Sequence, residues 1–227
     1  MPRRLRVDHE GAWQHVINRG IDHARIFDDV AARIFLFELR GASSRHCIEV
    51  HGYCILPNHY HLLLHTPEAG LSTAMQGLSS RFTQAVNRYR ERDGPLFKGR
   101  FRSIAIKDDA HLVKVSQYIH LNPVEAGLVS APEHWPWSSA AAYLGLAPKP
   151  EWLHVVALLE MFGATNPESA YAQYLRDGRG VANEAGSDPS PPTLQFSTKV
   201  CARGLTPFTP QSAGPGTPAA RGRATRW

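Results

Sequence analysis

The sequence predicts an α+β fold in which an antiparallel sheet is covered on one face by helices. Three observations predict it. Short strand-like segments alternate with longer helical segments, and a Pro-Asn turn joins two of the strands directly. The composition is that of a globular protein, with 43% hydrophobic and 20% charged residues among 227. This composition excludes collagen, coiled coils and wholesale disorder.

The predicted elements follow one another in the order β-α-β-β-α-β-α. Their types follow from the period of the apolar residues, which is two in strands and 3.6 in helices. They are a strand over 13–19, a helix over 30–43, strands over 47–56 and 59–65, a helix over 71–92, a strand over 101–107 and a helix over 111–121.

Turn residues and capping residues set the predicted boundaries. The first helix takes its apolar residues from Ile34, Phe35, Phe37 and Leu39. The boundary signals are Gly20 after the first strand, Asp28 and Asp29 before the first helix, Pro57-Asn58 between the second and third strands, Gly94-Pro95 after the second helix, Asp108-Asp109 before the third helix, and Asn122-Pro123 at its end.

This order is that of the split βαβ, ferredoxin-like fold, which carries many functions and constrains function little by itself. We predict one domain over 1–177, in which residues 125–177 add at least one more helix against the same core. The last fifty residues, 178–227, include 24 Gly, Pro, Ser or Thr and show no apolar periodicity. We therefore predict a disordered, mildly basic C-terminal tail over 178–227.

Neither a membrane span nor a secretory signal is predicted. No stretch approaches the roughly 18–20 apolar residues that cross a bilayer, and the basic start of the chain is not followed by an apolar core. Cys47, Cys54 and Cys201 are too few and too scattered for a disulfide framework or a zinc ribbon. We expect a protein of the reducing cytoplasm.

Positive charge is concentrated in one segment of the body. The formal net charge is +5, of which residues 178–227 carry +4 and residues 1–177 only +1. Residues 81–102 nevertheless hold seven basic and two acidic side chains, with aromatic residues interleaved. This alternation suits a single-stranded nucleic acid, whose phosphates and bases it can contact. A solvated helix with its aromatic residues in the core is the simpler alternative.

His59 and His61 form a candidate metal site. Residues i and i+2 of a strand project from the same face, so both imidazoles point to one side and Tyr60 points into the apolar interior. Two neighbouring imidazoles can hold a divalent ion. A single His-x-His pair is a weak signal in a chain with 12 histidines. His65 shares this face further along, where we expect it to pack or to line the cleft.

Tyr118 and Asn122 form a second candidate constellation. They lie four residues apart and share a face if the helix persists to Asn122. A phenol titrates near pH 10, but a divalent cation can polarise a phosphate and favour the phenolate nucleophile. The amide oxygen of Asn122 could supply a third ligand. Alternatively, Tyr118 lies at the edge of the core and Asn122 only ends its helix.

Five ordered segments within about residues 10–146 match a known family. They are His15-Val16-Ile17-Asn18-Arg19-Gly20, Leu56-Pro57-Asn58-His59-Tyr60-His61-Leu62-Leu63-Leu64, Leu96-Phe97-Lys98-Gly99-Arg100-Phe101-Arg102-Ser103, Tyr118-Ile119-His120-Leu121-Asn122-Pro123-Val124 and Trp135-Pro136-Trp137-Ser138-Ser139. In these segments the chain resembles the single-tyrosine HUH transposases, and most closely their REP-associated tyrosine transposase branch, relatives of the insertion-sequence 200/605 enzymes.

The resemblance implies a transposase-like enzyme that cleaves single-stranded DNA, often near a hairpin, and rejoins it through a 5′-phosphotyrosine intermediate. By this resemblance Tyr118 is the nucleophile, and His59 and His61 bind a divalent metal ion, Mg²⁺ or Mn²⁺. Asn122 stands where insertion-sequence relatives use a glutamine, which is one methylene longer. Such relatives also pair, so a homodimer is an expectation.

Our candidates for DNA contacts come from the basic segment. The cationic side chains would contact the backbone of single-stranded or hairpin DNA, and the aromatic rings would stack on bases. The candidates are Arg81, Arg88, Lys98, Arg100 and Arg102 for the backbone and Phe97 and Phe101 for stacking.

Two other functions remain open at this point. The chain could be a domesticated module that binds hairpin DNA without transferring strands, with an affinity that falls steeply with salt. It could also be a metallohydrolase that uses bound water. A covalent protein–DNA adduct that depends on Tyr118 distinguishes the strand transferase from both.

Overall fold

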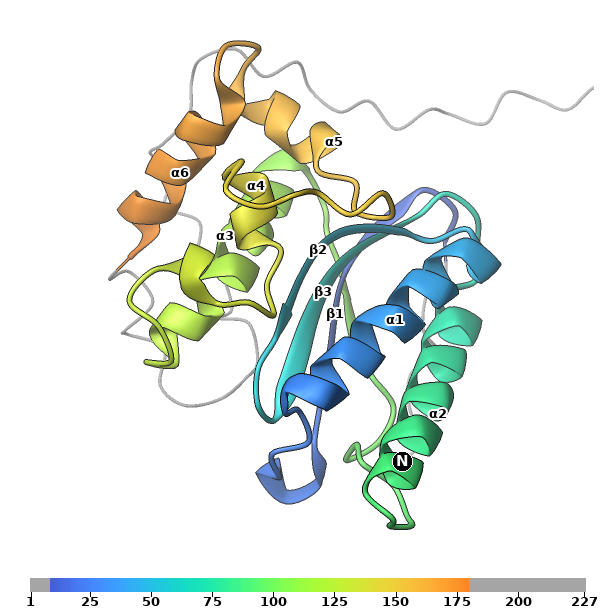
Figure 1. Ribbon diagram of the computed structural model, residues 1–227. Helices are drawn as coiled ribbons and strands as arrows, with labels where there is room; N and C mark the ends of the chain where they lie inside the picture. The colour runs from blue at the N-terminus through green and yellow to red at the C-terminus, as the bar shows by residue number, and fades with distance from the viewer. Residues whose placement is uncertain (1–8, 180–227) are drawn as a thin grey trace, which may run out of the picture.

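Four strands form one antiparallel sheet in the computed structural model, which describes residues 9–179 (Figure 1). The strand order is β2-β3-β1-β4, and every neighbouring pair is antiparallel. This order confirms the predicted split βαβ, ferredoxin-like fold. Residues 1–8, and the predicted tail from residue 180 onward, lie outside the described residues. The strands are β1 (Ala12–Arg19), β2 (Glu49–Ile55), β3 (His59–Thr66) and β4 (Arg102–Ala105).

Helices cover both faces of the sheet, not one face as we predicted. Figure 1 shows α1 and α2 side by side on one face and α3 on the other. The segment after α3 packs on the same side as α3 and adds short helices to that layer. The helices are α1 (Asp29–His46), α2 (Leu71–Tyr89), α3 (Asp109–Glu125), α4 (Ala140–Tyr143), α5 (Val156–Leu159) and α6 (Pro167–Gly178), with single 3₁₀ turns at Ile21–His23, Pro132–His134 and Glu160–Phe162.

The alternation of side chains along β3 divides them between the two layers. Tyr60, Leu62 and Leu64 are fully buried. The ring of Tyr60 packs on Phe35 of α1, with 4.6 Å between centroids, which confirms that Tyr60 points into the apolar interior. Because neighbours on a strand face opposite sides, His59 and His61 face the α3 layer instead.

The ends of α1 and α2 show which predicted boundaries hold. Asp28 caps α1, since its Oδ1 accepts the N–H of Ala31 at 2.8 Å. Phe37, one of the apolar residues expected in this helix, is 71% exposed and takes no part in the core. Helix α2 ends at Tyr89, short of the predicted residue 92, because Glu91 takes a left-handed conformation with φ of 47°.

Helix α3 continues through Pro123, although we predicted that Asn122-Pro123 would end it. Proline has no N–H to donate, which removes one hydrogen bond to the preceding turn, but the hydrogen bonds that follow it can still form. The carbonyl groups of Asn122 and Pro123 still accept the N–H groups of Ala126 and Leu128. The helix therefore persists to Asn122, and Tyr118 and Asn122 share one helical face, as we predicted for this case.

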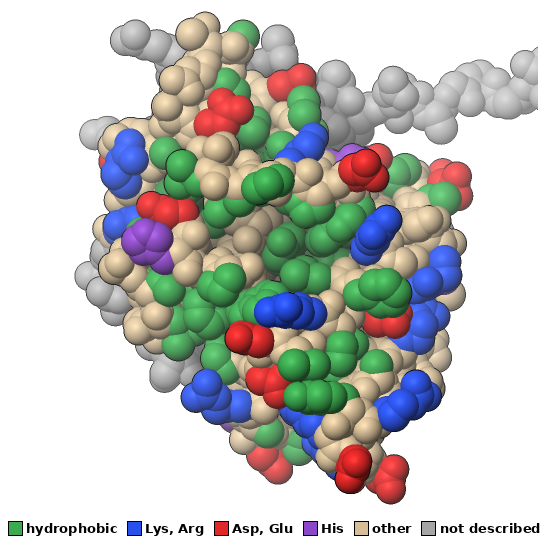
Figure 2. All heavy atoms as spheres, in the orientation of Figure 1, with side chains coloured by type: hydrophobic (Ala, Val, Ile, Leu, Met, Phe, Trp, Pro, Cys, Tyr) green, Lys and Arg blue, Asp and Glu red, His purple; other side chains and the backbone are tan. Residues whose placement is uncertain are grey.

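The surface on the side of α1 has no single basic patch. In Figure 2, Lys and Arg side chains are dispersed over this face, and apolar side chains gather near its middle. No helix within residues 9–179 has both the length and the apolar character needed to cross a membrane.

Candidate active site

Two imidazoles and one phenol meet between β3 and α3. The rings of His59 and His61 lie 4.9 Å apart by their centroids. The ring of Tyr118 stands edge-on to His61, with 5.3 Å between centroids and 88° between ring planes. Tyr118 is half-buried, and His61 is completely buried. The structure therefore brings together three of the residues that the sequence singled out.

A further histidine, His15 of β1, belongs to the same cluster. Its Nε2 lies 3.0 Å from Nδ1 of His61, and its ring centroid lies 5.8 Å from that of Tyr118. Sequence reasoning gave His15 no role, because its contact with His61 arises only when β1 pairs with β3. His15 and Arg19 lie on one face of β1, but their spacing does not reveal which residues of β3 they lie beside.

The hydrogen bonds of the imidazoles leave one nitrogen of each ring for a ligand. Nδ1 of His59 bonds Oδ1 of Asn58 at 2.6 Å, and Nδ1 of His61 bonds His15. Nε2 of His61 is buried and has no hydrogen-bond partner within residues 9–179. Metal-binding histidines usually engage their second nitrogen in this way.

Burial keeps these rings neutral, as metal binding requires. Desolvation lowers the pKa of His59 to about 4, with a smaller contribution from Arg19. Burial also lowers the pKa of His61 well below its usual range, with smaller contributions from His15 and His59. The donor set of two neutral imidazoles fits a divalent ion.

The amide of Asn122 lies against the turn of α3 that carries Tyr118. Its Nδ2 donates a hydrogen bond to the backbone carbonyl of Tyr118 at 2.7 Å. Burial raises the pKa of the Tyr118 phenol, and the Asn122 side chain partly offsets this increase. The amide nitrogen of Asn122 is thus used within the helix, and its oxygen is the atom of this side chain that suits a hard cation.

Part of the predicted basic segment runs alongside the end of β1. The N–H of Lys98 donates to the carbonyl of Arg19 at 3.0 Å, and Nδ2 of Asn18 donates to the carbonyl of Gly99 at 3.2 Å. Arg19 is itself the register partner of His59. The segment over 98–102, in which Lys98, Arg100 and Arg102 are exposed, therefore lies near the histidine pair.

The remaining predicted DNA contacts lie on the other face of the sheet or are buried. Arg81 and Arg88 are on α2, on the opposite face of the sheet from Tyr118, and Arg81 pairs with Glu38 of α1 at 3.0 Å. Phe97 and Phe101 are only 7% and 5% exposed. Their burial in the core disfavours the base stacking that we predicted for them.

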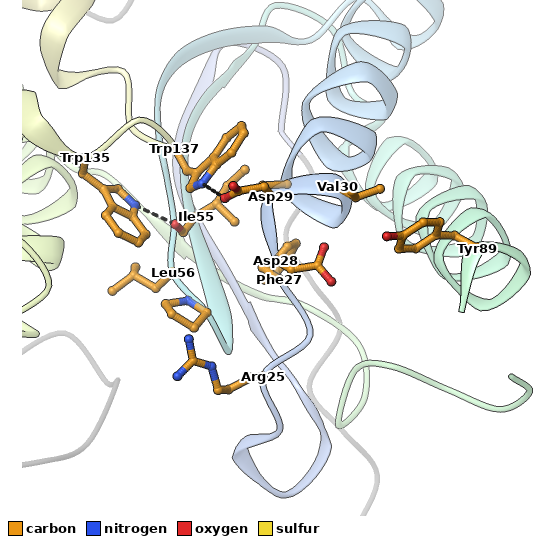
Figure 3. A pocket seen from close by; sticks show the side chains of 12 residues that line it. Arg25, Phe27, Asp28, Asp29, Val30, Ile55, Leu56, Tyr89, Trp135 and Trp137 are labelled. Carbon is orange, nitrogen blue, oxygen red and sulfur yellow. Dashed lines mark hydrogen bonds between the residues drawn. The ribbon is translucent and has the colours of Figure 1, made fainter. Parts of the chain in front are cut away.

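A pocket of about 500 Å³ lies apart from this cluster, and none of His59, His61 and Tyr118 lines it. Figure 3 shows it between the start of α1 and the segment that carries Trp135 and Trp137. The indole of Trp135 donates to the carbonyl of Ile55 at 2.8 Å, and that of Trp137 donates to Asp29 at 3.2 Å. These bonds fix the segment after α3 against β2 and α1.

Comparisons with known proteins agree with one another. The family model described as transposase, IS200 like, matches residues 9–122. A Haemophilus influenzae protein named as a REP-associated tyrosine transposase is 32% identical, over 46% of this chain and 68% of that protein. A solved structure of a REP-associated tyrosine transposase bound to a REP hairpin is 21% identical. It superposes with a TM-score of 0.57 over 69% of this chain and 96% of that one, which supports the fold.

Proposed function

Because the chain belongs to the IS200-like transposase family, we propose that it cleaves single-stranded DNA at hairpins and rejoins it through a covalent bond to Tyr118. The observation that carries this proposal is the contact of Tyr118 with His61 across the space between β3 and α3. The hairpin-bound relative with the same fold supports hairpin DNA as the partner.

In the proposed reaction, the phenolic oxygen of Tyr118 attacks the scissile phosphate. A bond forms between this oxygen and phosphorus, and the bond to the 3′-oxygen breaks. The phenol loses its proton and the departing 3′-oxygen gains one, which leaves a 5′-phosphotyrosine and a free 3′-hydroxyl. Attack by another 3′-hydroxyl reverses these steps and joins the strands. The energy of the broken bond is kept in the phosphotyrosine, so the cycle needs no nucleotide.

His59 and His61 are the proposed ligands of a divalent ion, with Asn122 as the proposed third. Such an ion, Mg²⁺ or Mn²⁺, would polarise the phosphate and favour the phenolate. This help matters because burial raises the pKa of Tyr118. His15 orients His61, and Arg19 with the segment 98–102 would contact the phosphate backbone.

Incubation with a hairpin oligonucleotide that carries a single-stranded flank tests the proposal. With Mg²⁺ or Mn²⁺, we expect a protein–DNA adduct that survives a denaturing gel and is abolished by a chelator. Tyr118→Phe should lose the adduct, because it removes the attacking oxygen. Tyr89→Phe is the matched control, since Tyr89 is 54% exposed at the end of α2.

Three outcomes would contradict the proposal in different ways. An adduct that persists in Tyr118→Phe would place the nucleophile elsewhere. Hairpin binding without cleavage in either metal would favour a DNA-binding module. Nicking with turnover and no adduct, unchanged in Tyr118→Phe, would favour a hydrolase that uses water.

A further inference from the structure

A second cluster of metal-binding side chains lies near the other end of β3. Oε2 of Glu49 is 2.7 Å from Nδ1 of His65 and 3.2 Å from Nε2 of His51. One ligand atom from each of these residues lies within 4.8 Å of the others. Within residues 9–179, no other group of three His, Cys, Asp or Glu side chains converges in this way.

Strand geometry separates this cluster from the candidate active site. His65 lies four residues beyond His61 on β3, which at about 3.3 Å per residue is about 13 Å. Leu63 lies between them on the same face and is fully buried. An ion held at one cluster would therefore not share ligands with the other.

A β-bulge in β2 brings His51 into the cluster. Val50 pairs with Leu64 and Gly52 pairs with Leu63, so His51 is the extra residue. A bulge redirects the side chain of its extra residue, and bulges are frequent beside functional sites. The bulge in β2 thus lies at His51, the histidine that contacts Glu49.

The imidazole of His51 is buried, and its hydrogen bonding is incomplete. Its side chain is 4% exposed, and Nδ1 has no hydrogen-bond partner in the described part of the chain. The ring of Trp13 packs on it, with 4.2 Å between centroids, and lies 4.8 Å from the ring of His65. Nε2 is the nitrogen of His51 that faces Glu49. Nδ1 lies on the other side of the ring, where an ordered water can satisfy it, so only Nε2 is a candidate ligand in this cluster.

We propose that Glu49, His51 and His65 bind a divalent transition-metal ion of the zinc type. Two imidazoles and a carboxylate are a zinc donor set, with ligand atoms about 2.0 Å from the metal and hence about 3.3 Å from one another. The two separations from Glu49 are already near this value. Magnesium prefers oxygen ligands and does not compete for such a site.

The surroundings supply a route of entry and a further ligand. The side chains of Glu49 and His65 are 36% and 22% exposed, so an ion can reach them from solvent. Water can complete a tetrahedral site. The bound ion would fasten β2 to β3.

Zinc titration of the full chain carrying His59→Ala and His61→Ala tests the second site in isolation. In calorimetry with excess Mg²⁺, we expect one zinc ion per chain. Adding Glu49→Gln or His65→Ala should weaken zinc binding by more than the roughly 10–100-fold that typically follows the loss of a residue hydrogen-bonded to a metal ligand. Adding His134→Ala, an exposed histidine far from the cluster in sequence, should leave binding unchanged.

Thermal unfolding provides a second measurement. Zinc should raise the Tm of the His59→Ala/His61→Ala chain and should not raise it once Glu49→Gln is added. Glu49→Gln preserves the size of a partly exposed side chain, so the fold should be retained, and circular dichroism checks this. Absence of zinc binding to the chain lacking His59 and His61, or binding that survives both Glu49→Gln and His65→Ala, overturns the proposal. Neither measurement involves DNA, so the result is independent of the proposed strand transfer.

Discussion

His61 owes its orientation to His15, which makes His15 the clearest positioning residue of the site. The two rings are hydrogen-bonded at 3.0 Å and stacked with 5.1 Å between centroids. A second residue that fixes the tautomer and orientation of a metal ligand typically contributes 10–100-fold in metal affinity or activity, as an order of magnitude. Because this hydrogen bond uses Nδ1 of His61, the lone pair of Nε2 is available to bind the ion.

We therefore predict that His15→Phe raises the Mn²⁺ concentration for half-maximal adduct formation by about 10–100-fold. His15→Gln, which can still hydrogen-bond His61, should restore part of this loss. The measurement is a metal titration of adduct formation on hairpin DNA, with His134→Ala as the control. An unchanged metal dependence in His15→Phe would show that His15 only fills space.

Among single residues, the sequence predicted those site residues whose shared face follows from their spacing within one strand or one helix. His59 and His61 are two apart on a strand, and Tyr118 and Asn122 are four apart on a helix, so the local period predicts their shared faces. His15 and Arg19 join the site only through pairing between β1 and β3. Residue spacing within a segment carries no information on such register.

Among the elements, the segment over 98–102 and helix α2 divide the predicted basic region between two sides of the sheet. The segment runs beside Arg19 and the histidine pair, whereas Arg81 on α2 is held by Glu38. The segment over 98–102 is therefore the part of the basic region that we expect to contact DNA bound at the proposed site. One continuous basic run in the sequence therefore corresponds to two different surroundings.

This difference predicts distinct salt dependences. Each lost phosphate contact on single-stranded DNA reduces the slope of log K against log salt by about 0.7. Arg100→Ala should weaken hairpin binding and reduce the slope by about this amount. Arg81→Ala should leave the slope unchanged. Fluorescence anisotropy with a labelled hairpin at several salt concentrations measures both, and equal slopes for the two variants would contradict the assignment.

The boundaries of the elements were predictable where a local signal decides them. Asp28 caps α1 because its carboxylate satisfies an N–H group of the first turn, a short-range effect. Pro123 was misread because packing of α3 on the sheet outweighs one missing hydrogen bond near the end of the helix. Phe37 lies on the solvent side of α1, which the apolar character of its side chain alone does not reveal.

For the whole molecule, the order of elements predicted the sheet and at least one further helix over 125–177, but not the contacts that hold α3 in place. Those contacts centre on His120, whose side chain is buried. Nδ1 of His120 bonds the hydroxyl of Tyr171 on α6 at 2.6 Å, and Nε2 bonds Oγ of Ser139 at 2.7 Å. The Ser139 Oγ in turn accepts the N–H of Tyr53 on β2. One imidazole thus links α3, α6 and the sheet, through contacts that span 19 and 51 residues of sequence.

This buried ring makes the stability of the metal-free protein sensitive to acid. Burial lowers the pKa of His120 to about 3, whereas a histidine in the unfolded chain titrates near 6.5. Between these values the unfolded state binds a proton that the folded state does not, so stability is complete above pH 6.5 and falls as the pH decreases. Because of this residue, the free energy of unfolding should decrease by about 1.4 kcal/mol for each pH unit of acidification.

His120→Gln should remove this contribution to the slope of unfolding free energy against pH, measured by urea unfolding between pH 6.5 and 4.5, whatever the variant costs in stability at neutral pH. His134→Ala should keep the slope, and a slope unchanged in His120→Gln would mean that His120 is not neutral in the folded protein.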